Sequence, residues 1–190
     1  MTRRILLFLA PLSFLLWCCL IAAAHPLQAR DHLTAKEVDL VKDAQELDKR
    51  IDVFIKAADR RLLVIKGLQA NSKELKKDAE FWGDLPSGTR SELVGDIAKI
   101  LDEAITNIDD VSSRDEKNPA LPRALRKLAA AASRMMEQLK PLQSSAVDAA
   151  EVSNFDELLD NAETIVQAAS KLAPEVVQPR KGKGEKTKIN

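Results

Sequence analysis

Apolar residues recur every three or four positions along most of the chain after residue 33, which is the period of an α-helix. The first stripe consists of Val38, Val41, Ala44, Leu47, Ile51, Phe54, Ala58, Leu62 and Ile65. Thr34 and Glu37 before it have the spacing of a capping box, in which each side chain bonds an amide of the first turn. The pattern predicts one continuous helix from Thr34 to about Gly67, on the order of 50 Å long at 1.5 Å per residue.

Charged residues fill the other faces of this predicted helix. Acids precede bases by four positions at Glu46 with Arg50 and at Asp52 with Lys56. Each such pair stabilises a helix by only about 0.2–0.5 kcal/mol. We therefore interpret these charges as a solvated face and not as a functional site.

A short helix is predicted within residues 71–88, NSKELKKDAEFWGDLPSG, where it begins at Asn71 and is closed by Gly83. Phe81 and Trp82 lie next to each other near its end. They are either a partner-binding surface or an aromatic plug over one end of a helical bundle. The plug is the favoured interpretation, because bulky aromatic side chains are mostly buried.

A second long helix is predicted to start at another capping box, formed by Thr89 and Glu92. Its apolar stripe is Leu93, Ile97, Ile100, Leu101, Ala104, Ile108 and Val111. The polar run DDVSSRDEKNP, residues 109–119, ends it. We interpret this run as a solvated connection, because its acids lack the spacing and the turn glycine of a calcium-binding loop.

Prolines mark a third long helix. Pro119 and Pro122 suit its first turn, where a missing amide costs little. Its stripe is Leu121, Leu125, Leu128, Ala132, Met135 and Leu139. The stripe continues beyond Pro141 through Leu142, Ala146 and Ala150, so we predict a kink at Pro141 and not an end.

A fourth long helix is predicted to be capped at Ser153 or Asn154 and to end at Pro174. Its stripe is Phe155, Leu158, Leu159, Ala162, Ile165, Val166, Ala169 and Leu172. Together the stripes predict an all-α domain over residues 34–174. We expect an elongated, mostly antiparallel bundle of four long helices and one short connecting helix. Residues 175–190 are predicted to form a disordered basic tail, because the run QPRKGKGEKTKIN, residues 178–190, has no apolar face to bury.

The first 24 residues, MTRRILLFLAPLSFLLWCCLIAAA, have the basic start, apolar stretch and small-residue end of a secretory signal peptide. Cleavage is predicted after Ala24, or alternatively after Ala29, which leaves residues 25–33 as a flexible N-terminal segment. The alternative is an uncleaved inner-membrane anchor, since the apolar run is about as long as a membrane-spanning helix. We expect an exported protein, periplasmic or extracellular.

The run LTAKEVDLVKDAQELDKRI, residues 33–51, resembles the start of a group of secreted, helical bacterial proteins without an assigned activity. The resemblance covers mainly the first predicted helix. It implies export and helicity, and it transfers no chemistry.

Charge is distributed unevenly along the chain. Acids and bases number 29 each over the whole sequence, and removing Arg3 and Arg4 with the leader leaves a charge of −2. The tail from Pro179 carries five bases and Glu185, a charge of +4, so the body between leader and tail carries −6. An acidic body is a poor match for a phosphate backbone, so no nucleic-acid partner is expected.

Few side chains could perform catalysis or bind a metal. Cys18 and Cys19 both lie in the leader, tyrosine is absent, and the two histidines, His25 and His32, lie near the predicted mature N-terminus. No glycine-rich phosphate loop, nucleophile elbow or Glu-x-x-His pair is present. We predict a protein that is not an enzyme and has no cofactor or metal.

Two functions remain. The favoured one is an interaction or scaffold module of the bacterial cell envelope, which binds another envelope protein or itself through a helix face or the Phe81–Trp82 region. The alternative is a carrier that holds a small apolar or lipid ligand, suggested by the alanines, methionines and Pro141 of the third helix.

The basic tail is a separate candidate, as an electrostatic tether to anionic lipids or surface polymers. Its bases are Arg180, Lys181, Lys183, Lys186 and Lys188.

Overall fold

The computed structural model describes residues 30–67 and 73–173, and the side chains of 68–77 are not described. The chain divides into two units, residues 1–31 and 32–190. The described part of the second unit is all-α and contains no strand. Its helices are α2 (Ala35–Asp43), α3 (Leu47–Ile65), α4 (Lys73–Trp82), α5 (Arg90–Arg114), α6 (Ala120–Gln143) and α7 (Ala149–Ser170). The predicted signal peptide and basic tail lie outside the described residues.

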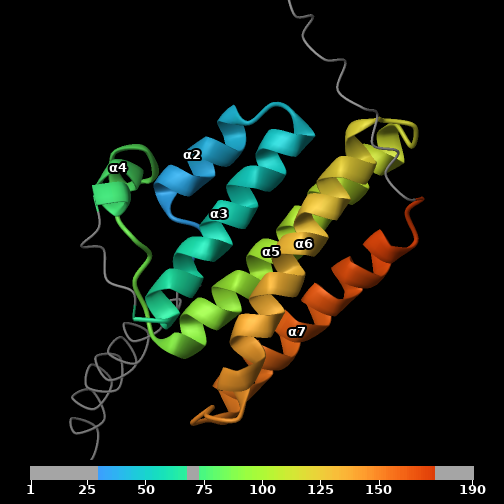
Figure 1. The fold of residues 1–190 in the computed structure, drawn as a ribbon. Coiled ribbons are helices and arrows are strands. Elements are labelled where there is room, and N and C mark those ends of the chain that lie inside the picture. Colours follow the sequence, from blue (N-terminus) through green and yellow to red (C-terminus); the bar gives the residue numbers. More distant parts are fainter. Residues whose placement is uncertain (1–29, 68–72, 174–190) are drawn as a thin grey trace, which may run out of the picture. The chain divides into compact units, whose positions relative to one another are not determined.

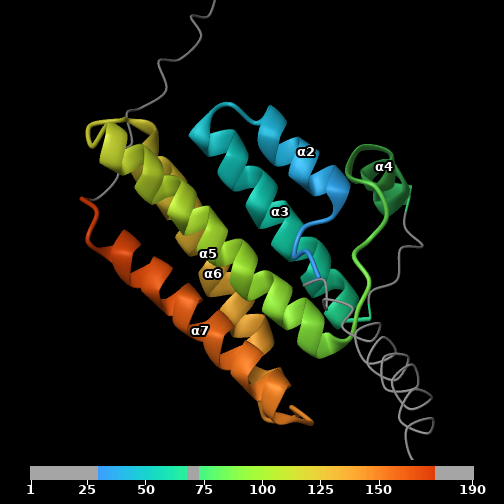
Figure 2. The same cartoon turned by 180° about the vertical axis from the view of Figure 1, so that it is seen from behind.

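The core lies among four long helices, α3, α5, α6 and α7, which lie side by side in both views (Figures 1 and 2). Helix α5 packs against α3, α6 and α7, and α6 packs against α3 and α7. The largest fully buried apolar side chains are Ile51, Phe54, Leu93, Ile97, Ile100, Leu101, Leu128, Met135, Leu139 and Phe155. All of them belong to the stripes predicted from the sequence, so the helical periodicity identified the core of this unit correctly.

Both predicted capping boxes are confirmed. The amide of Glu37 donates to Thr34 Oγ1 at 3.3 Å, and the amide of Thr34 donates to Glu37 Oε2 at 2.9 Å. The amide of Glu92 donates to Thr89 Oγ1 at 3.2 Å, and the amide of Thr89 donates to Glu92 Oε2 at 2.7 Å. Each box satisfies two amides that the first turn of a helix leaves without a partner.

The prediction of one continuous first helix is wrong, because the chain turns back between Asp43 and Leu47 and forms the α2–α3 pair. Glu37 on α2 bonds both Arg60 and Arg61 on α3. In a straight helix residues 37 and 60 would lie about 35 Å apart at 1.5 Å per residue, so these bonds require the turn.

The turn itself satisfies two carbonyls through side chains. Gln45 Nε2 donates to the carbonyl of Lys42 at 2.9 Å, and Arg50 Nε donates to the carbonyl of Ala44 at 3.1 Å. Neither glycine nor proline occurs between residues 43 and 47. The break therefore has no sequence signal of the usual kind.

The short helix ends as predicted. Gly83 has φ of 73°, a left-handed conformation that favours glycine, and its amide donates to the carbonyl of Ala79 at 2.9 Å. The predicted start, Asn71, lies outside the described residues. Within the described residues, α4 begins at Lys73.

The predictions for the polar run and for Pro141 need correction. Helix α5 continues through the first part of the polar run to Arg114. Helix α6 ends at Gln143, so Pro141 lies in its last turn and the stripe does not continue as a kinked helix. Proline supplies no amide for the helical hydrogen bond, so a position near the end is the one where it costs least.

The start of α7 also differs from the prediction. Asp148, and not Ser153 or Asn154, caps the helix, because its side chain accepts the amide of Glu151 at 2.7 Å. Asn154 lies inside α7 and donates through Nδ2 to the carbonyl of Ser91 on α5 at 2.9 Å. A residue expected to start a helix therefore links two helices instead.

Candidate functional site

Four charged side chains form a buried ion cluster between α2, α3 and α5, namely Glu37, Arg60, Arg61 and Asp96. Each is at most 4% exposed. Glu37 Oε1 accepts from Arg60 Nη1 and from Arg61 Nη1, both at 2.8 Å. Arg61 Nε lies 3.8 Å from Asp96 Oδ2. Two acids thus face two arginines in a region closed to solvent.

The arginines of the ion cluster also bind backbone carbonyls of two connecting segments. Arg60 donates to the carbonyls of Trp82 at 3.0 Å, Gly83 at 2.8 Å and Asp84 at 2.5 Å. Arg61 donates to the carbonyl of His32 at 2.6 Å. The cluster therefore fastens both the segment before α2 and the connection from α4 to α5 onto α3.

Burial disfavours the charged form of Glu37 and by itself would raise its pKa. The hydrogen bond and charge of Arg61, the hydrogen bond from the amide of Thr34 and the charge of Arg60 outweigh this effect, so the pKa of Glu37 lies below its ordinary value. Burial also lowers the pKa of Arg60, although the charge of Glu37 opposes that shift. The lowered pKa keeps Glu37 ionised at neutral pH, and an arginine guanidinium retains its proton in proteins. The cluster is suited to holding elements together and not to proton transfer.

Sequence reasoning missed this cluster, because Arg60 and Arg61 were assigned to a solvated face and Glu37 only to a capping box. One signal was present. Arg61 follows Phe54 by seven residues and Ala57 by four, so it occupies an inward position of the apolar stripe. A charged residue at such a position indicates a buried partner of opposite charge.

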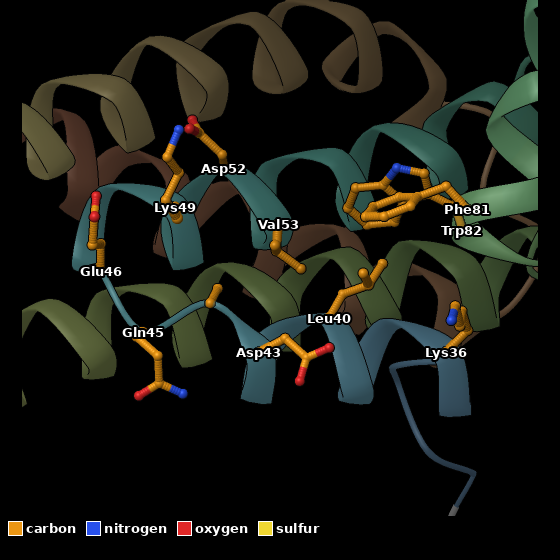
Figure 3. A pocket seen from close by; sticks show the side chains of 11 residues that line it. Lys36, Leu40, Asp43, Gln45, Glu46, Lys49, Asp52, Val53, Phe81 and Trp82 are labelled. Atoms are coloured by element: carbon orange, nitrogen blue, oxygen red, sulfur yellow. The ribbon is translucent and has the colours of Figure 1, made fainter.

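A groove of about 610 Å³ runs between α2 and α3 and ends at the last residues of α4 (Figure 3). We call it the aromatic groove. Its apolar lining comes from Leu40, Val53, Phe81 and Trp82. Figure 3 shows Leu40 and Val53 between the two helices, with the two aromatic side chains at one end and Gln45 toward the other.

The two predicted site aromatics lie together at the lip of this groove. Their ring centroids are 6.0 Å apart at 69°, an edge-to-face arrangement. The guanidinium carbon of Arg60 lies 5.9 Å from the centroid of the Trp82 ring, within the range of a cation–π contact. Phe81 is 60% exposed, so the interpretation as a buried plug is wrong for this residue.

The turn end of the groove carries unpaired carboxylates. Asp43 and Glu46 are both exposed, and within the described ranges neither forms an ion pair. Asp52 also lines the groove, but its carboxylate binds Lys127 Nζ of α6 at 2.8 Å. Lys36 and Lys49 bring positive charge to the same groove.

The predicted ion pairs along the first helix are not formed. Arg50 donates instead to Asn107 Oδ1 of α5 at 3.1 Å, and Lys56 binds Asp78 of α4 at 2.5 Å. Spacing along one helix could not reveal these partners, because they belong to other helices. Charged side chains of α3 therefore link it to other helices, and not all of them serve only to face solvent.

A second ionic contact joins α5 to the start of α7. Arg90 Nε donates to Glu151, and Arg90 Nη2 donates to the carbonyl of Ser145 at 2.6 Å. Glu151 is 2% exposed, and its other carboxylate oxygen accepts the amide of Val147 at 2.9 Å. The bond from Arg90 and the amide of Val147 lower the pKa of Glu151. This contact fixes the α6–α7 connection.

The described histidine is bound within the fold, since His32 Nε2 lies 2.8 Å from Glu103 Oε2. Among the described side chains, those of residues 30–67 and 78–173, no group of three or more His, Asp or Glu is placed to hold a metal ion. His25 and the five bases of the tail lie outside the described residues.

Within the described ranges, none of the helices combines the length and the apolar character needed to cross a bilayer.

Comparison with known proteins gave no match: no protein-family model, no curated protein and no solved structure resembles the chain. The aromatic groove and the tail bases are the candidate sites that remain.

Proposed function

We propose that this chain is an exported, non-enzymatic protein of the bacterial cell envelope that acts as an interaction or scaffold module through the aromatic groove. One observation carries the proposal: the aromatic side chain of Phe81 is 60% exposed at the lip of a groove with an apolar lining. Its partner is another envelope protein or a second copy of the chain.

The exposed ring is a favourable place for a partner to bind. Covering the free part of Phe81 would remove on the order of 100 Å² of apolar surface from water, worth about 2–3 kcal/mol. Trp82 is held by Arg60 on one side, so the pair is already ordered before a partner arrives. Aromatic anchors of this kind commonly dominate the energy of an interface.

In this proposal α3, α5, α6 and α7 form an antiparallel bundle, and α2 and α4 flank α3 to form the groove. The bundle is the rigid support, and the groove is the recognition surface. The leader directs export, and the tail bases Arg180, Lys181, Lys183, Lys186 and Lys188 add a weak electrostatic contact with anionic surfaces.

The carrier alternative has less support. Two of the α6 residues that suggested it, Ala132 and Met135, are fully buried in the core. The aromatic groove is open to solvent and lined by several charges. Apolar ligands are usually enclosed on most sides, so the groove suits a protein surface better than a lipid.

The test compares Phe81→Ala with Val147→Ala, which truncates a residue that is 84% exposed and lies at the α6–α7 connection, away from the groove. Each full chain is expressed in the envelope, cross-linked and purified, and covalent adducts are quantified by mass spectrometry. We expect Phe81→Ala to reduce one specific protein adduct at least about tenfold, as loss of an anchor residue does. Val147→Ala should leave that adduct unchanged.

Two results would overturn the proposal. Equal adduct yields from Phe81→Ala and the unmodified chain would remove the groove from the interface. A bound lipid in native mass spectra, without any protein adduct, would support the carrier instead.

A further inference from the structure

A second hollow, of about 340 Å³, lies where α5 ends, α6 begins and α7 ends. Both ribbon views place these three helix ends at the same end of the bundle (Figures 1 and 2). We call it the terminal hollow. Its apolar lining comes from Ile108, Leu121, Pro122, Leu125 and Leu172.

Two acids line the terminal hollow near the C-terminal end of α5. Asp109 and Glu116 line it, and within the described part of the chain neither forms an ion pair, whereas Asp110 pairs with Arg114. The C-terminal end of a helix carries a partial negative charge, so acids are unfavourable there and a cation is favourable. One base, Lys117, also lines the hollow. The site therefore combines an apolar floor with unpaired negative charge.

The chain itself continues from this place. Leu172 lines the hollow, and the carbonyl of Ala173 accepts from Arg126 Nη2 of α6 at 2.5 Å. The next eight residues are PEVVQPRK, so two valines follow Ala173 by three and four positions, and two bases follow three positions later. An extended chain spans at most about 3.3–3.6 Å per residue, so Val176 reaches about 10 Å from Ala173 and Lys181 about 27 Å.

We infer that the segment Val176–Lys181 docks on this chain's own terminal hollow. Val176 and Val177 cover the apolar floor, and Arg180 and Lys181 meet Asp109 and Glu116. The segment thus carries an apolar pair and a basic pair, which complement the apolar and the acidic groups that line the hollow. Lys183, Lys186 and Lys188 then remain free for an anionic surface.

Tethering favours this occupant over any other. Over so short a connection the effective concentration of the segment is in the millimolar range, so weak contacts suffice for docking. A separate partner would have to displace the segment first. The inference goes beyond the proposed function, because it concerns neither the aromatic groove nor its partner, and it assigns two of the five tail bases, Arg180 and Lys181, to a site on the chain itself.

The test uses the full chain labelled with ¹⁵N. Amide hydrogen exchange is followed by NMR at Val176 and Val177, because exchange slows where a segment is docked. In parallel, a carbodiimide couples lysines directly to carboxylates in contact, and mass spectrometry locates the bonds. We expect exchange at both valines to be at least about tenfold slower than in an open chain. Lys181 should couple to Asp109 or Glu116.

Two pairs of variants give matched comparisons. Val176→Ser with Val177→Ser should abolish the slow exchange, whereas Ile189→Ser should not. Asp109→Asn with Glu116→Gln should abolish the coupling, whereas Glu157→Gln with Asp160→Asn, which alters exposed acids in the middle part of α7, should not. High salt should weaken the coupling, since it screens exposed charges.

Three outcomes would overturn the inference. Exchange at the valines at the open-chain rate would show that the segment does not dock. If Lys181 coupled equally to Glu157 and to Glu116, the segment would contact exposed acids in general and not the terminal hollow in particular. Bonds that join labelled to unlabelled chains in a mixed sample would assign the hollow to a second copy.

Discussion

Helix α3 is held to the rest of the fold by two different kinds of contact. Toward α5 and α6 it presents fully buried apolar side chains such as Ile51 and Phe54. Toward α2 and the residues that follow α4 it presents the ion cluster, in which Arg60 and Arg61 bind Glu37 and five backbone carbonyls. Both sides exclude water, but only the apolar side has a periodic pattern.

The two sides respond differently to substitution. An apolar contact tolerates a smaller apolar residue at a cost of about 0.5–1.5 kcal/mol for Ile→Val, because the neighbours lose only dispersion contacts and area. A buried ion cluster tolerates no single deletion, because the remaining charges lose their partner in a region without water. The cluster therefore specifies one arrangement of α2 and of the connection after α4, while the apolar side supplies most of the stability.

The largest effect is expected for Ile51→Asp, which places a charge without a partner in the apolar core. Ile51 is completely buried, so we expect a loss of about 4 kcal/mol or more in the free energy of unfolding, measured by urea denaturation. Asp52→Ala next to it is the control and should cost about 0.5 kcal/mol or less, since its ion pair with Lys127 is exposed. Similar losses for both variants would place residue 51 outside the core.

The next effect is expected for Glu37→Ala, which leaves Arg60 and Arg61 buried without their carboxylate. We expect a loss of about 3–5 kcal/mol in the free energy of unfolding. Glu46→Ala is the matched control, because this acid is exposed and has no ion pair in the described part of the chain. If the two losses were equal, the ion cluster would not hold α2 in place.

Part of the Glu37 contribution should depend on pH. The pKa of Glu37 is lower in the folded chain than in the unfolded chain, so its stabilisation is complete above the unfolded value of about 4.3 and is lost as pH falls through the folded value. Urea denaturation should therefore show that the difference in the free energy of unfolding between the unmodified chain and Glu37→Gln becomes smaller in acid. A gap that stayed constant from pH 7 to pH 3 would contradict the assignment.

The smallest effect concerns α5, whose start is fixed by local contacts. Thr89→Ala removes the oxygen that accepts the amide of Glu92 and should cost about 1 kcal/mol. The same substitution at Thr106, exposed in the middle of α5, should be neutral or slightly stabilising, because alanine favours a helix interior. Calorimetry on both variants measures the difference. A larger loss of stability for Thr106→Ala than for Thr89→Ala would contradict the assignment of Thr89 as the cap.

The sequence predicted the helices where the cause of the structure is local. The capping boxes at Thr34 and Thr89 and the glycine end at Gly83 lie within four residues of their partners, so spacing alone reveals them. The apolar stripes predicted the core for a similar reason, since a helix has one period. The end of α6 near Pro141 and the cap of α7 at Asp148 were mispredicted. At both places the local sequence is compatible with more than one helix boundary, and the contacts of Glu151 and Asn154 with α5 stabilise the observed one.

The candidate site was only partly predictable. Phe81 and Trp82 were identified from their size and adjacency, but their place at the lip of a groove depends on the turn between α2 and α3. That turn has no glycine or proline, and it arises from bonds between residues more than 20 positions apart. Periodicity placed Arg61 at an inward position, but it could not identify Glu37 as its partner.

The sequence by itself determined that this domain is helical, where α2, α5 and α6 start, and which large apolar residues form the core, because these follow from contacts within a few residues and from one repeating period. Only the tertiary structure decided that the first predicted helix folds back, that two arginines are buried, and that a groove opens beside Trp82. These features rest on ion pairs and carbonyl contacts between distant segments. Their energy depends on water being excluded, which happens only when all the helices are in place.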